Sequence, residues 1–487
     1  MNEPRRHSSA TKLNRIPDEL ERFVRRDTYS LLIKGKAGTG KTTLSLTILK
    51  TLGQASNFFY ISTRVSPRQL FTHYPWLEHF VQTIKPQPTS DNEEQVYKMS
   101  MFEDARLDEP ESLFERITNE LMDVKAPIII IDSWDAIASF MDKEARLNNE
   151  RVLQTWRERA GAKLIFISED TSHSTLDFLV DGIAELDQSV CDSSRLRQIK
   201  LIKLRGVKML NQIYYFSLNN SIFTSFLTYK PSEYVLSRLG PQNDLPKRND
   251  YSLEPYSVRG FGRIRTGYHE LDAVLEGGFP RKGIVILKFD PSIHVVAIAT
   301  FLAKIISNFI KRNNPVLLQP MSQTNPQAIM AIMRSYLGYF PNNNIFRILW
   351  SDIKNSEHID PTQYSLLKNS QFGLIERSIE MARKRCPESL MLSIFNCEHL
   401  KSLEDELRQR QTSVPSFLSE KTDLSIFVGT TGEAVYPPVE AHADLKLEVN
   451  LINGTLFLRP VSPVGPIFGL TPYKMDGIPR VNVEVLV

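Results

Sequence analysis

The sequence predicts an α/β protein with two tandem copies of one fold, each a parallel-centred sheet flanked by helices, the second copy being degenerate. Apolar runs typical of buried strands alternate with helical patterns through the first half, as in parallel α/β sheets. A glycine-rich loop separates the first such run from the first helical pattern, and the second half repeats landmarks of the first in order. The chain of 487 residues is also too long for one compact core.

The elements of the first half follow from the positions of its apolar residues. Strands are expected at residues 29–34, 57–62, 126–131 and 163–167, and helices at residues 112–121 and 151–160. Residues 201–204 and 212–218 have the pattern of a closing β-hairpin. Residues 72–111 form a long mixed segment rich in polar and charged residues, to which we assign no element.

Composition indicates where the domains begin and end, and it limits the classes of protein to which the chain can belong. We expect an N-terminal segment at 1–28, an ATP-binding domain at 29–228, a polar, proline-containing linker at 229–260 and a degenerate domain at 261–487. The net charge of +3 does not argue for nucleic acid, and the three cysteines suit a reducing cytosol. No signal peptide and no apolar run of about 18 residues is present, so we expect a cytoplasmic protein without a membrane.

The segment from Gly35 to Thr42 fits G-x-x-x-x-G-K-[ST] without a mismatch, directly after the strand at 29–34. Its glycines allow backbone N–H groups to surround an anion, and a helix follows whose positive end faces the phosphates. Lys41 is expected to reach the β- and γ-phosphates of ATP and to be catalytic. The residues expected to bind nucleotide here are Gly35, Lys36, Ala37, Gly38, Thr39, Gly40, Lys41, Thr42 and Thr43.

A magnesium site is expected beside this loop. Asp132 ends a run of four isoleucines, at the strand edge where its carboxylate can meet Mg²⁺ held by the Thr42 hydroxyl. Thr42 and Asp132 are therefore the predicted metal ligands, with Asp132 also counted among the nucleotide-binding residues and Ser133 as a supporting residue. The alternative for Asp132 is a buried or capping aspartate.

The usual catalytic carboxylate is absent. Hydrolysis needs a group that orients water, often a glutamate beyond a neighbouring strand, but residues 62–67 offer none. Glu169 or Asp135 could serve instead, or turnover of ATP and water to ADP and phosphate is slow and the protein is a switch. Arg64 could stabilise phosphate charge, contact a partner or be a solvated arginine. Ser168 could sense the γ-phosphate or cap a helix.

Two clusters of basic residues can each be interpreted as functional or as structural. Strand alternation in residues 200–206 places Lys203 and Arg205 on one face, with Ile202 and Leu204 on the other. Lys203 and Arg205 could enter a neighbouring subunit's nucleotide site as catalytic finger residues, or protect a sheet edge with charge. The run Arg383–Arg385 is typical of a solvated helix face rather than a nucleic-acid site.

The second half repeats the first without its phosphate-binding residues. Residues 31–44 align over residues 285–298 without a gap, which places Phe289 at Gly35 and Val295 at Lys41. Residues 131–137 align with residues 394–400, which places Phe395 at Asp132. A third pairing matches residues 180–186 with 443–449. An apolar side chain in place of Lys41 cannot hold a triphosphate, so the second half is predicted to be structural or to bind a partner.

These residues resemble the KaiC branch of RecA-like ATPases. Residues 266–283 are similar to that family's T-G-x-x-x-L-D entry, and Asp132-Ser133, Asp181-Gly182 and the K-L-R-G at 203–206 match as well. The resemblance implies tandem, RecA-like ATPase domains that often form oligomers, in which the K-x-R element crosses the interface. The paired glutamates of that family fall at Arg64 and Val65 here, a departure that bears on hydrolysis.

A second resemblance, strongest over the first domain, is to the archaeal gas-vesicle regulators of the GvpD family. It is carried by Tyr60–Pro67, Tyr74–Leu77 and Arg15–Pro17. The resemblance implies an ATP-binding negative regulator of gas-vesicle synthesis that acts on a GvpE-like transcriptional activator. The alternatives are an oligomeric KaiC/RadA-like ATPase, a hexamer or dimer, that acts on DNA or in signalling, and a slow ATPase without a partner. We find no loops rich in basic or aromatic residues of the kind that bind single strands.

Overall fold

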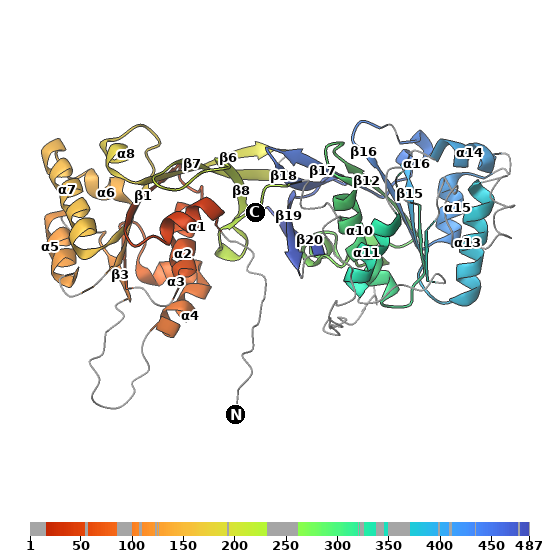
Figure 1. Cartoon of the computed structure of the whole chain (residues 1–487), viewed down its shortest axis with the longest axis horizontal. Coiled ribbons are helices and arrows are strands. Elements are labelled where there is room, and N and C mark those ends of the chain that lie inside the picture. The colour runs from red at the N-terminus through yellow and green to blue at the C-terminus, as the bar shows by residue number, and fades with distance from the viewer. Residues whose placement is uncertain are drawn as a thin grey trace, which may run out of the picture. The chain divides into compact units, whose positions relative to one another are not determined.

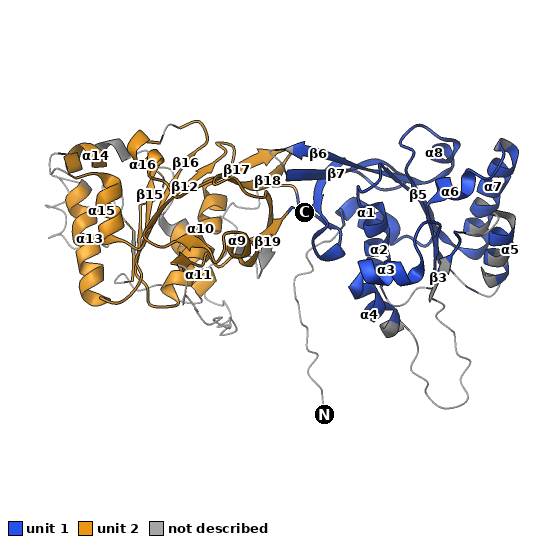
Figure 2. Ribbon diagram, turned by 180° about the vertical axis from the view of Figure 1, so that it is seen from behind, with its two compact units in different colours: residues 1–227, 486–487 blue, residues 228–485 orange. Residues whose placement is uncertain are grey.

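The computed structural model separates the chain into two compact units (Figure 1). Unit 1 comprises residues 1–227 and 486–487, and unit 2 comprises residues 228–485 (Figure 2). The structure describes residues 16–53, 57–84, 100–106, 110–121, 124, 126–191, 194–230, 262–319, 321, 326–337, 345–348, 371–397, 400–408, 412–433, 435–475 and 478–486. Residues 1–15 of the predicted N-terminal segment and residues 231–260 of the predicted linker lie outside these residues. None of the described helices is long and apolar enough to cross a bilayer.

Unit 1 is built on one sheet with the order β3-β2-β4-β5-β1-β6-β7-β8-β9. Its strands are β1 (Tyr29–Gly35), β2 (Phe58–Ser62), β3 (Ser100–Asp104), β4 (Ile128–Asp132), β5 (Lys163–Ser168), β6 (Gly182–Cys191), β7 (Ser194–Leu204), β8 (Ile213–Ser217) and β9 (Thr224–Ser225). Neighbouring strands within β3-β2-β4-β5-β1-β6 are parallel, and neighbouring strands within β6-β7-β8-β9 are antiparallel. The parallel centre is apolar because helices cover both faces.

The helices of unit 1 divide between the two faces of the sheet. One face packs against α1 (Asp18–Val24), α2 (Lys41–Leu52), α3 (Pro67–His73) and α4 (Pro75–Ile84), and the other against α5 (Pro110–Leu121), α6 (Trp134–Ala138), α7 (Lys143–Ala160) and α8 (Thr175–Leu179) (Figure 1). Alternate residues of the strands serve opposite cores, as Leu31 and Leu32 do. A short 3₁₀ turn, Asn219–Ser221, lies between β8 and β9.

Unit 2 has a sheet with the order β14-β13-β15-β16-β12-β17-β18-β19-β20. Its strands are β12 (Gly283–Phe289), β13 (Val316–Leu318), β14 (Phe346–Ile348), β15 (Leu392–Asn396), β16 (Leu424–Thr430), β17 (Leu445–Ile452), β18 (Thr455–Ser462), β19 (Phe468–Met475) and β20 (Ile478–Val485), while β10 (Arg263–Ile264) and β11 (Phe279–Pro280) form a separate ribbon. One face packs α9 (His269–Val274), α10 (Val295–Ile310) and α11 (Pro326–Leu337), and the other α13 (Gln371–Arg385), α14 (Leu400–Arg408), α15 (Val414–Lys421) and α16 (Pro437–Ala441).

The two sheets correspond strand for strand. The order β3-β2-β4-β5-β1-β6-β7 in unit 1 has the same connectivity as β14-β13-β15-β16-β12-β17-β18 in unit 2. Equivalent hydrogen bonds occur at the same position in both units. The carboxylate of Asp181 accepts a hydrogen bond from the amide of Ser30 in unit 1, and the carboxylate of Asp444 accepts one from the amide of Ile284 in unit 2. The predicted tandem α/β fold is therefore confirmed, with both copies complete as folds.

The sheet register corrects one pairing between the copies. Through β5, Asp132 lies level with Ile33, and through β16, Asn396 lies level with Leu287. Because the sequence alignment places Ile33 over Leu287, Asn396 occupies the place of Asp132. The expectation that Phe395 replaces Asp132 is wrong by one residue, since a shift of one residue exchanges the two faces of a strand.

Several elements differ from the sequence expectation. The mixed segment at 72–111 contains all of α4 and all of β3, and α3 and β6 were assigned no element. In addition, α1 lies upstream of residue 29, yet Leu20 and Phe23 are fully buried in the core of unit 1. The helix is therefore an integral part of this unit.

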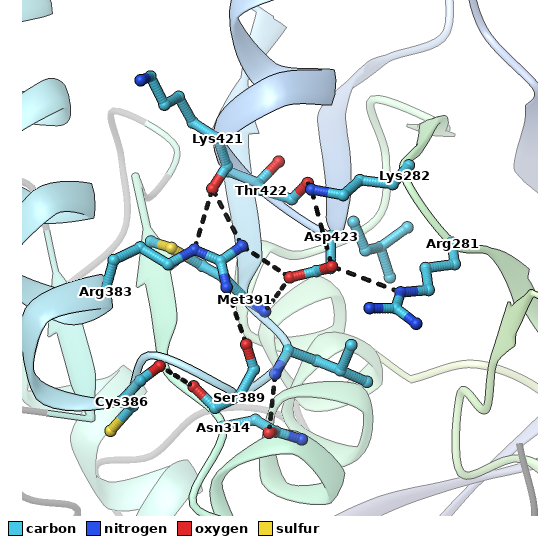
Figure 3. A network of polar contacts seen from close by, with 12 residues as sticks. Arg281, Lys282, Asn314, Arg383, Cys386, Ser389, Met391, Lys421, Thr422 and Asp423 are labelled. Carbon is cyan, nitrogen blue, oxygen red and sulfur yellow. Dashed lines mark hydrogen bonds and ion pairs between the residues drawn. The ribbon is translucent and has the colours of Figure 1, made fainter.

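A buried carboxylate joins the basic run of unit 2 to its sheet (Figure 3). The guanidinium of Arg383 donates to Asp423 at 2.7 Å and to the carbonyl oxygens of Ser389 and Lys421. The side chain of Asp423 is 4% exposed and also faces Arg281 at 3.5 Å. Burial alone would raise the pKa of Asp423, but the hydrogen bond from Arg383 and the backbone amide of Met391 hold it below the ordinary value. Arg383 is thus a structural residue, in contrast to the solvated face expected from its sequence.

Candidate nucleotide site

The phosphate loop of unit 1 connects the buried strand β1 to the first turn of α2. Gly38 and Gly40 have φ angles of 78° and 100°, in the left-handed region that favours glycine. A Cβ atom on Gly40 would lie 2.8 Å from Leu218 Cδ1, whereas one on Gly38 would meet nothing within 4 Å. Gly40 therefore allows the backbone to pass beneath Leu218, and Gly38 borders open space where a ligand can lie.

Lys41 is the first residue of α2, and its ammonium group is folded back on the loop. Its Nζ atom donates to the carbonyl oxygens of Gly35 at 2.7 Å and Lys36 at 2.9 Å, and the residue is 7% exposed. Burial lowers the pKa of Lys41, while the charges of Glu169 and Asp132 oppose that shift. This arrangement suits an incoming phosphate, because the ammonium is sheltered from water and is bonded mainly to neutral carbonyl oxygens.

Thr42 and Asp132 meet at the carboxyl edge of the sheet. The Thr42 hydroxyl donates to Asp132 Oδ2 at 2.6 Å, and the Tyr60 hydroxyl donates to the same oxygen at 2.7 Å. Burial and the charge of Asp132 raise the pKa of Tyr60 well above its ordinary value, so its phenol is a neutral donor. These groups fit Mg²⁺, since a threonine hydroxyl and a carboxylate are oxygen ligands in the arrangement of nucleotide-bound magnesium.

Thr63 and Ser133 complete the surroundings of the carboxylate. The Thr63 hydroxyl accepts a hydrogen bond from the amide of Ser133 at 2.8 Å, which fixes the main chain directly after Asp132. The Ser133 hydroxyl is buried and makes no hydrogen bond to any residue that the structure describes. The supporting role of Ser133 in a metal shell stays a prediction.

Glu169 lies at the mouth of the loop, directly after β5. Its carboxylate accepts two hydrogen bonds from Arg64, at 2.5 Å and 2.9 Å, and lies 3.9 Å from Lys41 Nζ. Asp135 accepts hydrogen bonds from the amide of Glu169 and from the hydroxyl of Ser168. Asp135 and Ser168 therefore stabilise the turn that carries Glu169, so Glu169 is the better placed of the two carboxylates considered for water.

Lys203 and Arg205 contact their own unit. Lys203 Nζ donates to the carbonyl oxygens of Val180 at 2.6 Å and Asp177 at 3.1 Å, and Arg205 reaches Asp181 at 3.4 Å. Their role across a subunit interface stays a prediction.

The expected alternation around these two residues is wrong. Ile202 is 51% exposed, whereas Leu204 is 4% exposed, so they do not share a buried face. The cause is a register shift between β6 and β7 at Ile183 and Ala184, which leaves Ile202 as an extra residue on β7.

In unit 2 the equivalent loop is closed by its own residues. The His294 side chain accepts a hydrogen bond from the amide of Val296 at 3.2 Å, and the His294 amide donates to the Tyr229 hydroxyl at 2.7 Å. Two amides at the start of α10 are thus already bonded. The adjacent pocket is lined almost entirely by apolar side chains: Val295, Ile298, Ala299, Leu302, Ile306, Leu318, Gln319, Met321, Ile329, Ile332, Met333, Ile394 and Val428.

Comparison with known proteins identifies the domain that carries this site. Residues 20–205, which include Lys41, Asp132 and Glu169, match the family described as GvpD gas vesicle protein, P-loop domain. Unit 1 carries a GvpD-type P-loop domain. Over 97% of its length the chain is also 23% identical to protein GvpD2 of Halobacterium salinarum, of which the match covers 96%. Protein GvpD1 of the same organism is 27% identical over 64% of this chain and 57% of its own length.

These matches confirm the resemblance to the GvpD family, with the nucleotide loop inside the matched domain and unit 2 outside it. Sequence reasoning missed Tyr60 as a partner of Asp132. A signal was available, because a tyrosine within the apolar run 58–61 usually has a hydrogen-bond partner for its hydroxyl. The Arg64–Glu169 pair had no such signal, since its members are 105 residues apart.

Proposed function

We propose that this GvpD-like protein is a nucleotide-dependent regulator in which unit 1 binds ATP with Mg²⁺ and unit 2 does not. The observation that carries the proposal is the contrast between the two loops. In unit 1, Lys41 is sheltered beside the Thr42–Asp132 pair. In unit 2, Val295 stands in place of the lysine, and His294 caps the helix.

Different residues of unit 1 bind the phosphates and the metal ion. Backbone amides of the loop and the start of α2 surround the phosphates, and Lys41 neutralises the charge at the β- and γ-positions. Thr42 and Asp132 hold the metal ion, while Tyr60 keeps the carboxylate in place. Mg²⁺ bound there would supply positive charge that offsets the negative charge of the phosphates.

We propose that hydrolysis is slow. Residues 62–67 contain no carboxylate to orient water, and Glu169 is held by Arg64. A general base must lie within hydrogen-bond reach of the water that it activates, so Glu169 would first have to leave Arg64. A long-lived ATP-bound state suits a switch that reports nucleotide to a partner.

The partner is proposed from the resemblance to GvpD proteins. It is a transcriptional activator of the GvpE type, and the regulation is negative: the protein in its ATP-bound state lowers the amount or activity of this activator in the cytoplasm. The family match over unit 1 and the similarity to GvpD2 over nearly the whole chain support this choice.

The test measures capture of the activator by the tagged full-length protein with ATP, with ADP and without nucleotide. Lys41→Ala is the test variant, and Val295→Ala, at the equivalent position of unit 2, is its matched control. Capture that needs ATP, is lost in Lys41→Ala and persists in Val295→Ala is the expected result. Capture that is independent of nucleotide and of Lys41 would show that unit 1 does not control the partner.

A further inference from the structure

One carboxylate at the mouth of the phosphate loop bridges two cations. Glu169 Oε1 lies 2.5 Å from an Arg64 guanidinium nitrogen and 3.9 Å from Lys41 Nζ, and the second guanidinium nitrogen reaches Oε2 at 2.9 Å. The three side chains come from different elements: the segment after β2, the first turn of α2 and the segment after β5. Both oxygens of Glu169 are thus held by a guanidinium fork, and Oε1 also faces the ammonium of the loop.

This is the environment that a terminal phosphate requires. A guanidinium group binds carboxylate and phosphate oxygens in the same two-pronged geometry, so the two anions are interchangeable partners of Arg64. Lys41 is the residue that reaches the γ-phosphate in a loop of this kind. Glu169 therefore satisfies, in the free protein, cations that a γ-phosphate would satisfy in the complex.

We propose that Glu169 is a built-in mimic of the γ-phosphate, and that a nucleoside triphosphate displaces its carboxylate from Lys41 and takes over Arg64. Arg64 is then the residue that distinguishes a triphosphate from a diphosphate, because the β-phosphate ends short of it. This inference rests on the proposed function, since it assumes that the loop of unit 1 binds nucleotide.

The surroundings allow the side chains to exchange partners while the main chain stays in place. The amide of Glu169 is bonded to Asp135, and the segment that carries Arg64 is fixed by the bond from the Thr63 amide to the Asp132 carbonyl. The side chains themselves are accessible, with exposed fractions of 50% for Arg64 and 32% for Glu169. Because both side chains are partly exposed, solvent screens the pair and an incoming phosphate can reach it.

The proposal predicts opposite effects of the two partners on ATP affinity. Glu169→Gln removes the competing charge and should increase the affinity for ATP about tenfold. Arg64→Gln removes a charged donor to the γ-phosphate and should lower the affinity for ATP about tenfold. Arg64→Lys, which keeps the charge but not the fork, should fall between wild type and Arg64→Gln. The affinity for ADP should change less than about twofold in the two Arg64 variants, and in Glu169→Gln it should change less than the affinity for ATP, because there only the charge beside Lys41 is altered for the β-phosphate.

The experiment is titration calorimetry of the full-length protein with ATP and with ADP in the presence of Mg²⁺. The control is Arg106→Gln, which removes another exposed arginine of unit 1 that is paired two-pronged with Asp104. It should alter neither affinity. Equal changes for ATP and ADP in Glu169→Gln or Arg64→Gln, or no change in either, would overturn the proposal while nucleotide binding stands. Failure of the wild-type chain to bind either nucleotide would instead overturn the proposed function and this inference together.

Discussion

The two fully buried tyrosines of unit 1, Tyr29 and Tyr60, should respond in opposite ways to loss of their hydroxyl groups. Tyr60 donates to Asp132 at 2.7 Å, whereas the Tyr29 hydroxyl makes no hydrogen bond to the residues that the structure describes. Both rings are 0% exposed, so phenylalanine fills the same space in each. The difference between the two variants therefore reports the hydrogen bond rather than the packing.

The structure sets the expected magnitudes. A hydrogen bond to a charged group contributes about 1.5–3 kcal/mol, so Tyr60→Phe should lower the free energy of unfolding of unit 1 by about that amount. A buried hydroxyl without a partner costs about 1–3 kcal/mol to bury, so Tyr29→Phe should leave unit 1 as stable as wild type or more stable. Tyr60→Phe should also weaken Mg²⁺ binding in the ATP complex, because Asp132 loses one of the two side-chain donors that hold it.

Hydrogen exchange of amides in β2 and β4 measures the stability of unit 1 separately from unit 2, and so avoids treating a two-unit chain as one transition. Exchange should become faster in Tyr60→Phe and should be unchanged or slower in Tyr29→Phe. If both variants lose the same stability, or Tyr29→Phe loses more, the assigned role of the Tyr60–Asp132 bond is wrong.

Two further predictions concern the loop of unit 1 and the carboxylate of unit 2. Gly40→Ala should weaken ATP binding more than Gly38→Ala, because both carry a backbone strain of about 1 kcal/mol but only the Cβ at position 40 also requires the Leu218 side chain to shift. Asp423→Asn should destabilise unit 2 by about 2–4 kcal/mol, because it removes the charge that holds Arg383. The depressed pKa of Asp423 means that this stability is present above the ordinary value of 3.8 and is lost as the pH falls through the lower, folded value. Acid unfolding of unit 2 should therefore be less steep in Asp423→Asn, and an unchanged profile would contradict the assignment.

The sequence predicted those parts of the fold whose signals are local. The strands at 29–34 and 163–167 are runs of apolar residues, and β1 and β5 lie there because both faces are covered. The helix α3 had a local signal that was overlooked, since Ser66 and Gln69 form a capping box around Pro67. The strand β6 alternates apolar and polar residues weakly, so its pairing depends on contacts far along the chain.

The candidate site shows the same division. The loop and the carboxylate of Asp132 were predictable because their chemistry follows fixed motifs. The pairing of Arg64 with Glu169 depends on how β2 and β5 are placed around β4, which no spacing in the sequence specifies. The one-residue error at Phe395 has the same origin, because only the hydrogen-bonded register places Asn396 level with Leu287.

The most direct test of the account is the stoichiometry of ATP binding to the full-length protein, measured by calorimetry with Mg²⁺ for wild type, Lys41→Ala and Val295→Ala. The account predicts a single ATP per chain, lost in Lys41→Ala and retained in Val295→Ala. Binding that survives Lys41→Ala, or a second ATP per chain that Val295→Ala removes, would contradict the claim that unit 1 alone senses nucleotide.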